Sequence, residues 1–160
     1  MTRLHPDVGH AGRKVLAVRL GKDLHAIPIM AIEEILPALP IESVPQCPPF
    51  VRGVVFVRGH LIPVVDAAER LGLRDHQRVI EPHIVCLRVG DRLIGVEFDE
   101  ALDLLDLGPG ELLPADRLGA RQGFFSGVIE RDGQIIRMLD PEKLIAEEEV
   151  EALEQVPRTA

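Results

Sequence analysis

The chain has 160 residues and a formal net charge of −8, so nucleic acid is not expected as a partner, because phosphate contacts need a basic face. It contains five Phe but no Trp or Tyr, so its core must be built from Val, Leu and Ile. Cys47 lies in a Pro-rich stretch and Cys86 in an apolar run, a pattern that favours reduced thiols in a cytoplasmic protein. No apolar run approaches the roughly 18 residues of a membrane span, which predicts no membrane insertion.

The first half of the chain predicts a leader, two hairpins and a short helix. We expect residues 1–12 to be a disordered leader. The stretch "VLAVRLGKDLHAIPI" at 15–29 predicts a hairpin, and a Pro-rich connector separates it from a second one, "GVVFVRGHLIPVVD" at 53–66. Asp66 with Glu69 forms a capping-box pattern at the start of a helix.

The second half repeats this order. "IVCLRVGDRLIGVEF" at 84–98 matches 15–29 with an offset of 69 residues, and "GVIERDGQIIRMLD" at 127–140 matches 53–66 with an offset of 74. Two matches in the same order indicate a duplicated unit of about 70 residues, with repeats at about 13–75 and 80–145. Strands this short predict a mainly β fold that closes into small barrels.

Several residues shared by the repeats are expected to serve the fold. Asp140-Pro141 predicts the N-terminus of a C-terminal helix over about 141–155, followed by a tail at 156–160. The residues predicted at structural turns and helix caps are Gly53, Asp66, Gly127, Gly133 and Asp140. Because Asp66 and Asp140 are twins, a catalytic role for Asp66 is disfavoured.

The sequence carries no recognisable catalytic pattern. Its six histidines lack metal-ligand spacing, and the chain has no phosphate-binding glycine motif and no GxSxG. The acidic residues between Asp99 and Asp106 fit a solvated face better than a cation site. The sequence therefore predicts a protein that is not an enzyme and holds no metal or cofactor.

The two repeats differ at positions where one would look for function. Glu34 and Arg58 in the first repeat correspond to Asp103 and Asp132 in the second. Only the first repeat therefore offers an acid and an arginine at this pair of positions. Duplication explains the shared residues as fold, whereas the diverged ones are candidates for binding.

The segments "IEEIL", "VPQCPPFVRGVVFVRGHLIPVVDAAERLGL" and "SGVIERDGQIIRMLDPEKLI" resemble the CheW-like domain of bacterial chemotaxis coupling proteins. The core of the resemblance is "RGHLIPVVD", and the likeness extends over nearly the whole chain, which predicts one CheW-like domain at 13–155. The resemblance implies two SH3-like five-stranded β-barrels packed against each other, with short helices and a C-terminal helix.

The resemblance also implies a function. Proteins of this family are adaptors that perform no catalysis. They bind the cytoplasmic tip of methyl-accepting chemoreceptors and a CheA-type histidine kinase, and other CheW-like proteins are further candidate partners. The implied location is the cytoplasm, with recruitment to membrane-associated receptor arrays.

The family pattern places a receptor-binding groove between the barrels. Carried over by position, its residues are Ile32, Glu34, Arg58, Gly59, His83 and Gly95. Glu34 and Arg58 are implied to pair at the rim of the groove, where an exposed ion pair would add only about 0–1 kcal/mol of stability. No motif places the kinase-binding residues.

Two alternatives remain at this level. One is a CheW-like adaptor for a different chemosensory pathway, such as surface motility or a second messenger. The other is a small-ligand-binding or enzymatic β-barrel module in which His83, Cys86 and the acids line a pocket.

Overall fold

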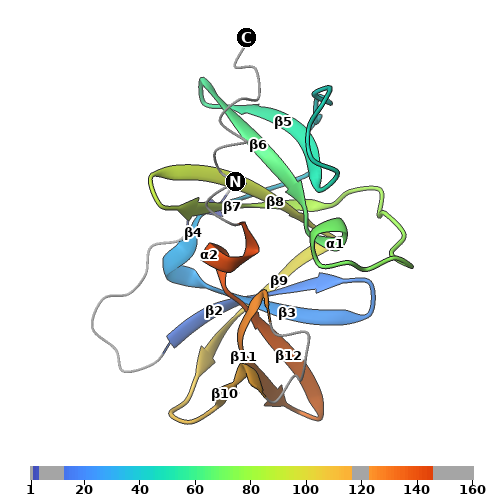
Figure 1. The fold of residues 1–160 in the computed structure, drawn as a ribbon. Coiled ribbons are helices and arrows are strands. Elements are labelled where there is room, and N and C mark those ends of the chain that lie inside the picture. The colour runs from blue at the N-terminus through green and yellow to red at the C-terminus, as the bar shows by residue number, and fades with distance from the viewer. Residues whose placement is uncertain (1, 4–12, 117–122, 146–160) are drawn as a thin grey trace.

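The computed structural model describes residues 2–3, 13–116 and 123–145, which form two lobes with two short helices at their junction (Figure 1). The elements up to residue 70 are β1 (Thr2–Arg3), β2 (Arg13–Leu20), β3 (Asp23–Pro28), the 3-10 helix η1 (Ile29–Ala31), β4 (Ile32–Leu36), β5 (Val51–Val57), β6 (His60–Asp66) and α1 (Ala67–Arg70). The later elements are β7 (His83–Val89), β8 (Arg92–Phe98), β9 (Glu100–Leu107), β10 (Leu112–Pro114), β11 (Phe125–Arg131), β12 (Gln134–Leu139) and α2 (Pro141–Leu144).

Each lobe is one strongly curved sheet. The first, called barrel A, has the strand order β1-β4-β7-β8-β6-β5, and the second, barrel B, has the order β10-β11-β12-β3-β2-β9. Each contains five longer strands and one short one, β1 with two residues and β10 with three. The predicted mainly β fold with two SH3-like five-stranded barrels is confirmed, with a short strand added to each.

The two repeats do not each form a separate barrel, because they exchange their first hairpins. Strands β2 and β3 of the first repeat complete barrel B, where β3 pairs in parallel with β12. Strands β7 and β8 of the second repeat complete barrel A, where β8 pairs in parallel with β6. Only η1 separates β3 from β4, and only Asp99 separates β8 from β9, so the chain continues into the other barrel instead of folding back.

Three apolar clusters form the core, and one of them holds the two barrels together. The largest lies between the barrels and includes Leu16 of β2, Phe98 of β8 and Leu144 of α2, each at most 2% exposed. The interiors of the barrels are filled by Leu36, Val55, Val57, Ile62, Val64, Ile84 and Cys86 in barrel A, and by Val15, Ala26, Leu107, Ile129, Ile136 and Met138 in barrel B. Aliphatic side chains therefore supply nearly all of the core.

Both short helices begin at an aspartate. Asp66 accepts a hydrogen bond from the N–H of Glu69 at 3.3 Å, and Asp140 accepts one from the N–H of Glu142 at 3.0 Å. Each carboxylate satisfies one of the free N–H groups of a helix N-terminus. The helix predicted over 141–155 begins as expected, but α2 ends at Leu144 because Ile145 has an extended backbone. Residues 146–160, with the predicted tail, lie outside the described part.

Two residues of the predicted leader take part in the fold. Thr2 and Arg3 form β1, which pairs with β4 in antiparallel orientation, so the leader prediction does not hold for this pair. The rest of the predicted leader, residues 1 and 4–12, lies outside the described residues.

Twin glycines mark where the connector of each repeat crosses a strand. A Cβ atom on Gly53 would lie 2.0 Å from the carbonyl oxygen of Glu42, and one on Gly127 would lie 2.5 Å from that of Leu113. Both glycines also adjoin a shift in strand register. Close backbone approach at a bulge therefore requires glycine at both positions.

Candidate functional site

The turn between β5 and β6 presents an unusual arginine. It lies at the end of barrel A away from α1 and barrel B (Figure 1). Arg58 has a φ of 50° and Gly59 a φ of 81°, and the twin residues Asp132 and Gly133 have 51° and 78°. Two consecutive positive φ angles fit the type I′ hairpin turn, which favours Asn, Asp or Gly at its first central position. Arg58 is therefore less suited to its turn than its twin Asp132.

Arg58 forms an ion pair with Glu34 of β4. The Glu34 side chain is 6% exposed and the Arg58 side chain 42% exposed. The expectation of an exposed pair is thus wrong, because the carboxylate lies inside the barrel and only the guanidinium reaches the surface. A buried carboxylate that lost this partner would carry an uncompensated charge.

Glu34 shares a row of the sheet with Gly95. Glu34 on β4 is the register partner of Cys86 on β7, and Cys86 is the partner of Gly95 on β8. A Cβ atom on Gly95 would lie 2.9 Å from Cγ2 of Ile84, so this site has no room for a side chain. Burial raises the pKa of the Cys86 thiol to about 12, with a further contribution from Glu34. Cys86 therefore stays protonated and unreactive.

The remaining predicted residues lie elsewhere. Ile32 is 5% exposed and belongs to the cluster between the barrels. His83 begins β7, and its Nδ1 accepts a hydrogen bond from the N–H of Ala101 at 2.7 Å. The structure thus brings together Glu34, Arg58 and Gly59 with Gly95 in barrel A, whereas Ile32 and His83 are not part of this group.

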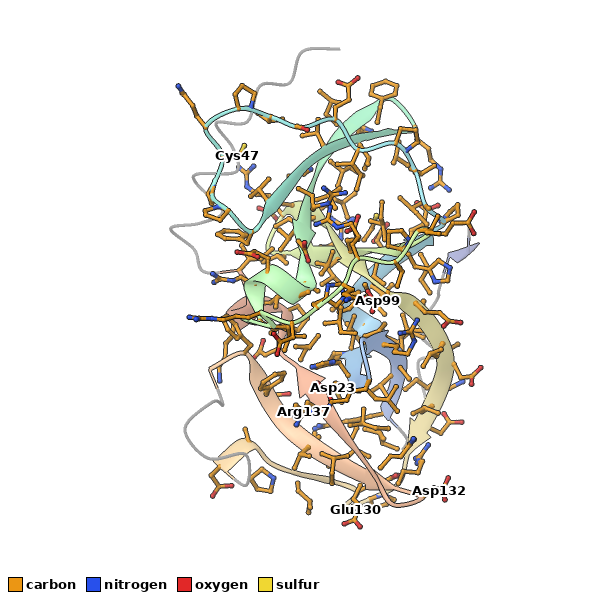
Figure 2. The ribbon with its side chains drawn as sticks, turned by 90° about the vertical axis from the view of Figure 1, so that its right-hand side faces the viewer. Asp23, Cys47, Asp99, Glu130, Asp132 and Arg137 are labelled. Atoms are coloured by element: carbon orange, nitrogen blue, oxygen red, sulfur yellow. The ribbon has the colours of Figure 1, made fainter. Side chains whose placement is uncertain are left out.

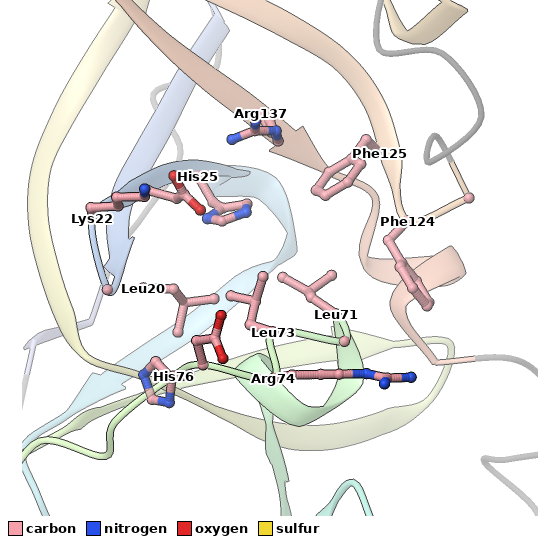
Figure 3. A pocket seen from close by; sticks show the side chains of 15 residues that line it. Leu20, Lys22, His25, Leu71, Leu73, Arg74, His76, Phe124, Phe125 and Arg137 are labelled. Carbon is pink, nitrogen blue, oxygen red and sulfur yellow. The ribbon is translucent and has the colours of Figure 1, made fainter.

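Apolar side chains of the largest cluster pack between the barrels. A hollow of about 1170 Å³ opens beside α1 (Figure 3). None of the six predicted receptor-binding residues lines it, and neither does Cys86. This hollow is therefore not the pocket lined by His83 and Cys86 that the alternative module would use.

Sequence reasoning missed the residues that do line this hollow, among them His25 and Arg137. A comparison of the two repeats could have pointed to these two residues. The offsets of 69 and 74 make Ile94 the twin of His25 and Pro63 the twin of Arg137, so two polar residues of the second barrel replace apolar ones of the first.

The exposed tip of the β5–β6 hairpin carries further contact groups. Phe56 is 61% exposed on β5, an edge strand of barrel A, and Arg58, Gly59 and His60 are also exposed. Aromatic and arginine side chains are enriched among the residues that dominate protein interfaces. This tip has the composition of a protein-binding surface.

Two further properties bear on the class of site. Within residues 2–3, 13–116 and 123–145, no three His, Cys, Asp or Glu side chains are grouped so that they could hold a metal ion. In the same residues, no helix has the length and apolar character needed to cross a membrane.

Comparison with known proteins gives consistent matches. Residues 14–149 match the family model of the CheW-like domain. The chain is 28% identical over 154 residues to a "Chemotaxis protein CheW" of Rhizobium meliloti, covering 95% of this chain and 99% of that protein. It is 30% identical over 138 residues to a "Chemotaxis protein CheW" of Thermotoga maritima, covering 84% and 88%.

A solved structure shares the fold. The crystal structure of the scaffolding protein TtCheW from Thermoanaerobacter tengcongensis superposes with a TM-score of 0.78 at 19% sequence identity. The superposition covers 90% of this chain and 94% of that one. The likeness of fold therefore extends over nearly the full length of both chains.

Proposed function

The chain belongs to the CheW-like domain family, and from this we propose that it is a non-enzymatic scaffold of chemotaxis signalling. It couples methyl-accepting chemoreceptors to a CheA-type histidine kinase and works in the cytoplasm, recruited to receptor arrays at the membrane. The names of the relatives in Rhizobium meliloti and Thermotoga maritima support the pathway. The match over 14–149 is the observation that carries the proposal.

We further propose that the receptor tip docks on barrel A at the β5–β6 hairpin. Arg58 and Gly59 are its exposed contact residues, and Phe56 adds apolar area beside them. Glu34 is buried, so its role is to hold the guanidinium of Arg58 in one orientation. Gly95 lies in the same row of the sheet as Glu34. Ile32 packs in the apolar cluster between the barrels.

The orientation of Arg58 matters more for recognition than for affinity. Charged groups placed in advance steer association and reject partners of the wrong charge. A fixed guanidinium also loses little side-chain entropy on binding, because its conformation is already restricted. The receptor surface that meets this tip should therefore carry an acceptor for Arg58 next to an apolar patch.

A pull-down tests this function. The tagged chain is used as bait in a lysate of the bacterium that encodes it, and bound proteins are identified by mass spectrometry. We expect a histidine kinase together with methyl-accepting receptors. Recovery of neither protein would overturn the proposed function.

A matched pair of variants tests the docking residue. Arg58→Asn keeps a residue that tolerates the positive φ of the turn but removes the guanidinium. Asp132→Asn makes the equivalent change in the twin turn of barrel B. We expect Arg58→Asn to lose receptor and Asp132→Asn to retain it. Equal receptor recovery by both variants would show that the receptor docks elsewhere.

A further inference from the structure

The hollow beside α1 has an apolar floor. Leu20 from the end of β2, Leu71 and Leu73 from the segment after α1, and Phe124 and Phe125 at the start of β11 line it (Figure 3). These side chains come from three separate parts of the chain. The floor would accept the apolar body of a small molecule, since most ligand sites combine apolar walls with a few polar groups.

A buried histidine stands at the inner wall. His25 of β3 is 3% exposed, and its Nδ1 has no hydrogen-bond partner among the described residues. Its ring stacks on Phe125 with 5.8 Å between the ring centroids and an angle of 21°. Burial lowers its pKa to about 4, with a further contribution from Arg137, so the imidazole is neutral near pH 7.

The hollow is also lined by cations. Arg137 of β12 is the register partner of His25, and both residues lie on the same wall (Figure 3). Lys22 and Arg74 line the hollow as well, and in the described part of the chain none of these three cations forms an ion pair. With Asp23 and Asp75 as the acidic lining residues, the lining carries three positive and two negative charges.

The walls of the hollow are tied to each other. Asp99, 6% exposed at the junction of the lobes (Figure 2), accepts a hydrogen bond from the N–H of Gly21 at 2.7 Å. Its other carboxylate oxygen lies 2.7 Å from Nε2 of His76. One buried carboxylate therefore connects the β2–β3 turn to the segment after α1. This arrangement forms the site in advance, which lowers the cost of binding.

The opposite wall is held by Arg70. Its guanidinium carbon lies 5.0 Å from the centroid of the Phe124 ring and 4.7 Å from that of Phe50. Its Nε donates a hydrogen bond to the carbonyl oxygen of Leu144 at 2.6 Å. Phe124 is thereby fixed between barrel B and α1.

The fold itself does not require polar residues at this place. The twins of His25 and Arg137 are Ile94 and Pro63, and the twin of Phe125 is Val51. Ile94 is 1% exposed in the cluster between the barrels, so an apolar residue fulfils the structural need in the first barrel. Within the described residues, barrel B differs by a buried histidine whose Nδ1 lacks a hydrogen bond, next to an arginine that forms no ion pair.

We propose that this hollow binds a small organic anion, with an aromatic or branched apolar body on the Leu and Phe floor and a carboxylate at Arg137 and His25. A carboxylate would accept charge-assisted hydrogen bonds from the guanidinium. The site uses none of the residues assigned above to receptor docking, so it is independent of the scaffold function.

A titration followed by two-dimensional amide NMR tests the proposal on the full chain. The probes are 3-phenylpropanoate and its uncharged analogue 3-phenylpropanamide, and the reporters are the amides of Gly21, Gly72 and Gly123, which all line the hollow. We expect saturable shifts with the carboxylate, with a Kd of about 1 mM, and binding of the amide weaker by about tenfold. Equal binding of the two probes, or no saturation, would overturn the proposal.

Variants locate the carboxylate. Arg137→Gln should weaken carboxylate binding about tenfold, whereas Arg13→Gln, an exposed arginine at the start of β2, should leave it unchanged. Arg74→Gln provides a second test at the other side of the hollow, and we expect a loss of about threefold. Unchanged affinity in Arg137→Gln would contradict the assignment, whatever the effect of Arg74→Gln.

Discussion

Arg58 illustrates how a single residue departs from what its local structure favours. Its φ of 50° suits Asn, Asp or Gly, and the second repeat has Asp132 in the same place. The arginine is compensated by a buried carboxylate, since Arg58 is the only cation that forms an ion pair with Glu34 among the described residues. Strained positions of this kind concentrate at functional sites, which agrees with the docking role proposed for this turn.

Removing Arg58 should destabilise the fold more than its exposure suggests. Arg58→Asn leaves the buried Glu34 carboxylate unpaired, and we expect the free energy of unfolding to fall by about 1–3 kcal/mol. Adding Glu34→Gln removes the buried charge, so the double variant should be less destabilised than the sum of the two single variants. Urea unfolding of the four proteins measures this coupling.

The control for this cycle is the exposed pair of Arg88 and Glu33. Their nearest side-chain atoms are 3.2 Å apart and both side chains are more than 40% exposed, at 49% and 43%. Arg88→Asn should therefore cost less than about 1 kcal/mol. Additive effects of Glu34→Gln and Arg58→Asn would show that their ion pair contributes nothing to stability.

His25 should make the fold sensitive to acid. Its pKa is lowered to about 4 in the folded chain by burial first and by Arg137 second, while Asp23 opposes the shift. Between pH 6.5 and 4 the unfolded chain therefore binds a proton that the folded chain does not. The free energy of unfolding then falls as the pH falls through this window, by about 2–3 kcal/mol from this group.

His25→Ile, which introduces the residue of the twin position, should remove this part of the pH dependence. The measurement is urea unfolding of wild type and variant at several pH values between 4 and 7. His60→Gln serves as a control because His60 is exposed. Parallel stability curves for wild type and His25→Ile would contradict the burial of a neutral imidazole.

At the scale of elements, the bulges of β5 and β11 decide how each connector crosses its barrel. Gly53 has a φ of 147°, and its missing side chain leaves room for the backbone of Glu42, which bridges to Val54. Gly127 leaves room in the same way for β10. Glycine is therefore needed at positions 53 and 127 for each connector to pair with its neighbouring strand.

Gly53→Ala should be strongly destabilising. The added Cβ would meet a carbonyl oxygen at 2.0 Å, and backbone cannot move aside as a flexible side chain can. We expect a loss of about 2–4 kcal/mol, measured as a shift of the urea midpoint. Gly108→Ala is the control, because its Cβ would meet only Oε1 of Glu111 at 3.8 Å. Similar midpoints for both variants would contradict the close approach.

The hairpins could be predicted from the sequence, whereas their assignment to barrels could not. Alternating apolar residues around Gly-containing turns indicated β2–β3, β5–β6, β7–β8 and β11–β12, and the structure has all four pairs. The exchange of first hairpins depends on long-range parallel pairing of β6 with β8 and of β3 with β12. Because the two repeats have nearly the same pattern, local sequence cannot distinguish which copy completes which sheet.

At the scale of the whole molecule, the exchange explains why the two barrels share one core. Each repeat contributes strands to both barrels, so the faces of β2 and β3 meet those of β7 and β8 in one shared core. The barrels cannot separate without breaking both sheets. The core between the barrels therefore belongs to the fold, and the proposed receptor contact at the β5–β6 tip lies outside it.

The candidate site was predictable from the sequence only at positions where the two repeats differ. The pair of Glu34 and Arg58 differs from its twins and forms an ion pair in the structure. The change from Ile94 and Pro63 to His25 and Arg137 is of the same kind, but its meaning depends on the hollow formed with the segment after α1. Burial of Ile32 in the seam likewise follows from tertiary packing, which the pattern of one strand does not contain.

Scaffolding is tested most directly by sedimenting receptor-containing membranes with the histidine kinase, with and without this chain. We expect the kinase to sediment with the membranes when the wild-type chain or Asp132→Asn is present, and much less with Arg58→Asn. Kinase that sediments equally well without the chain, or that remains in the supernatant when the wild-type chain is present, would contradict the proposed coupling.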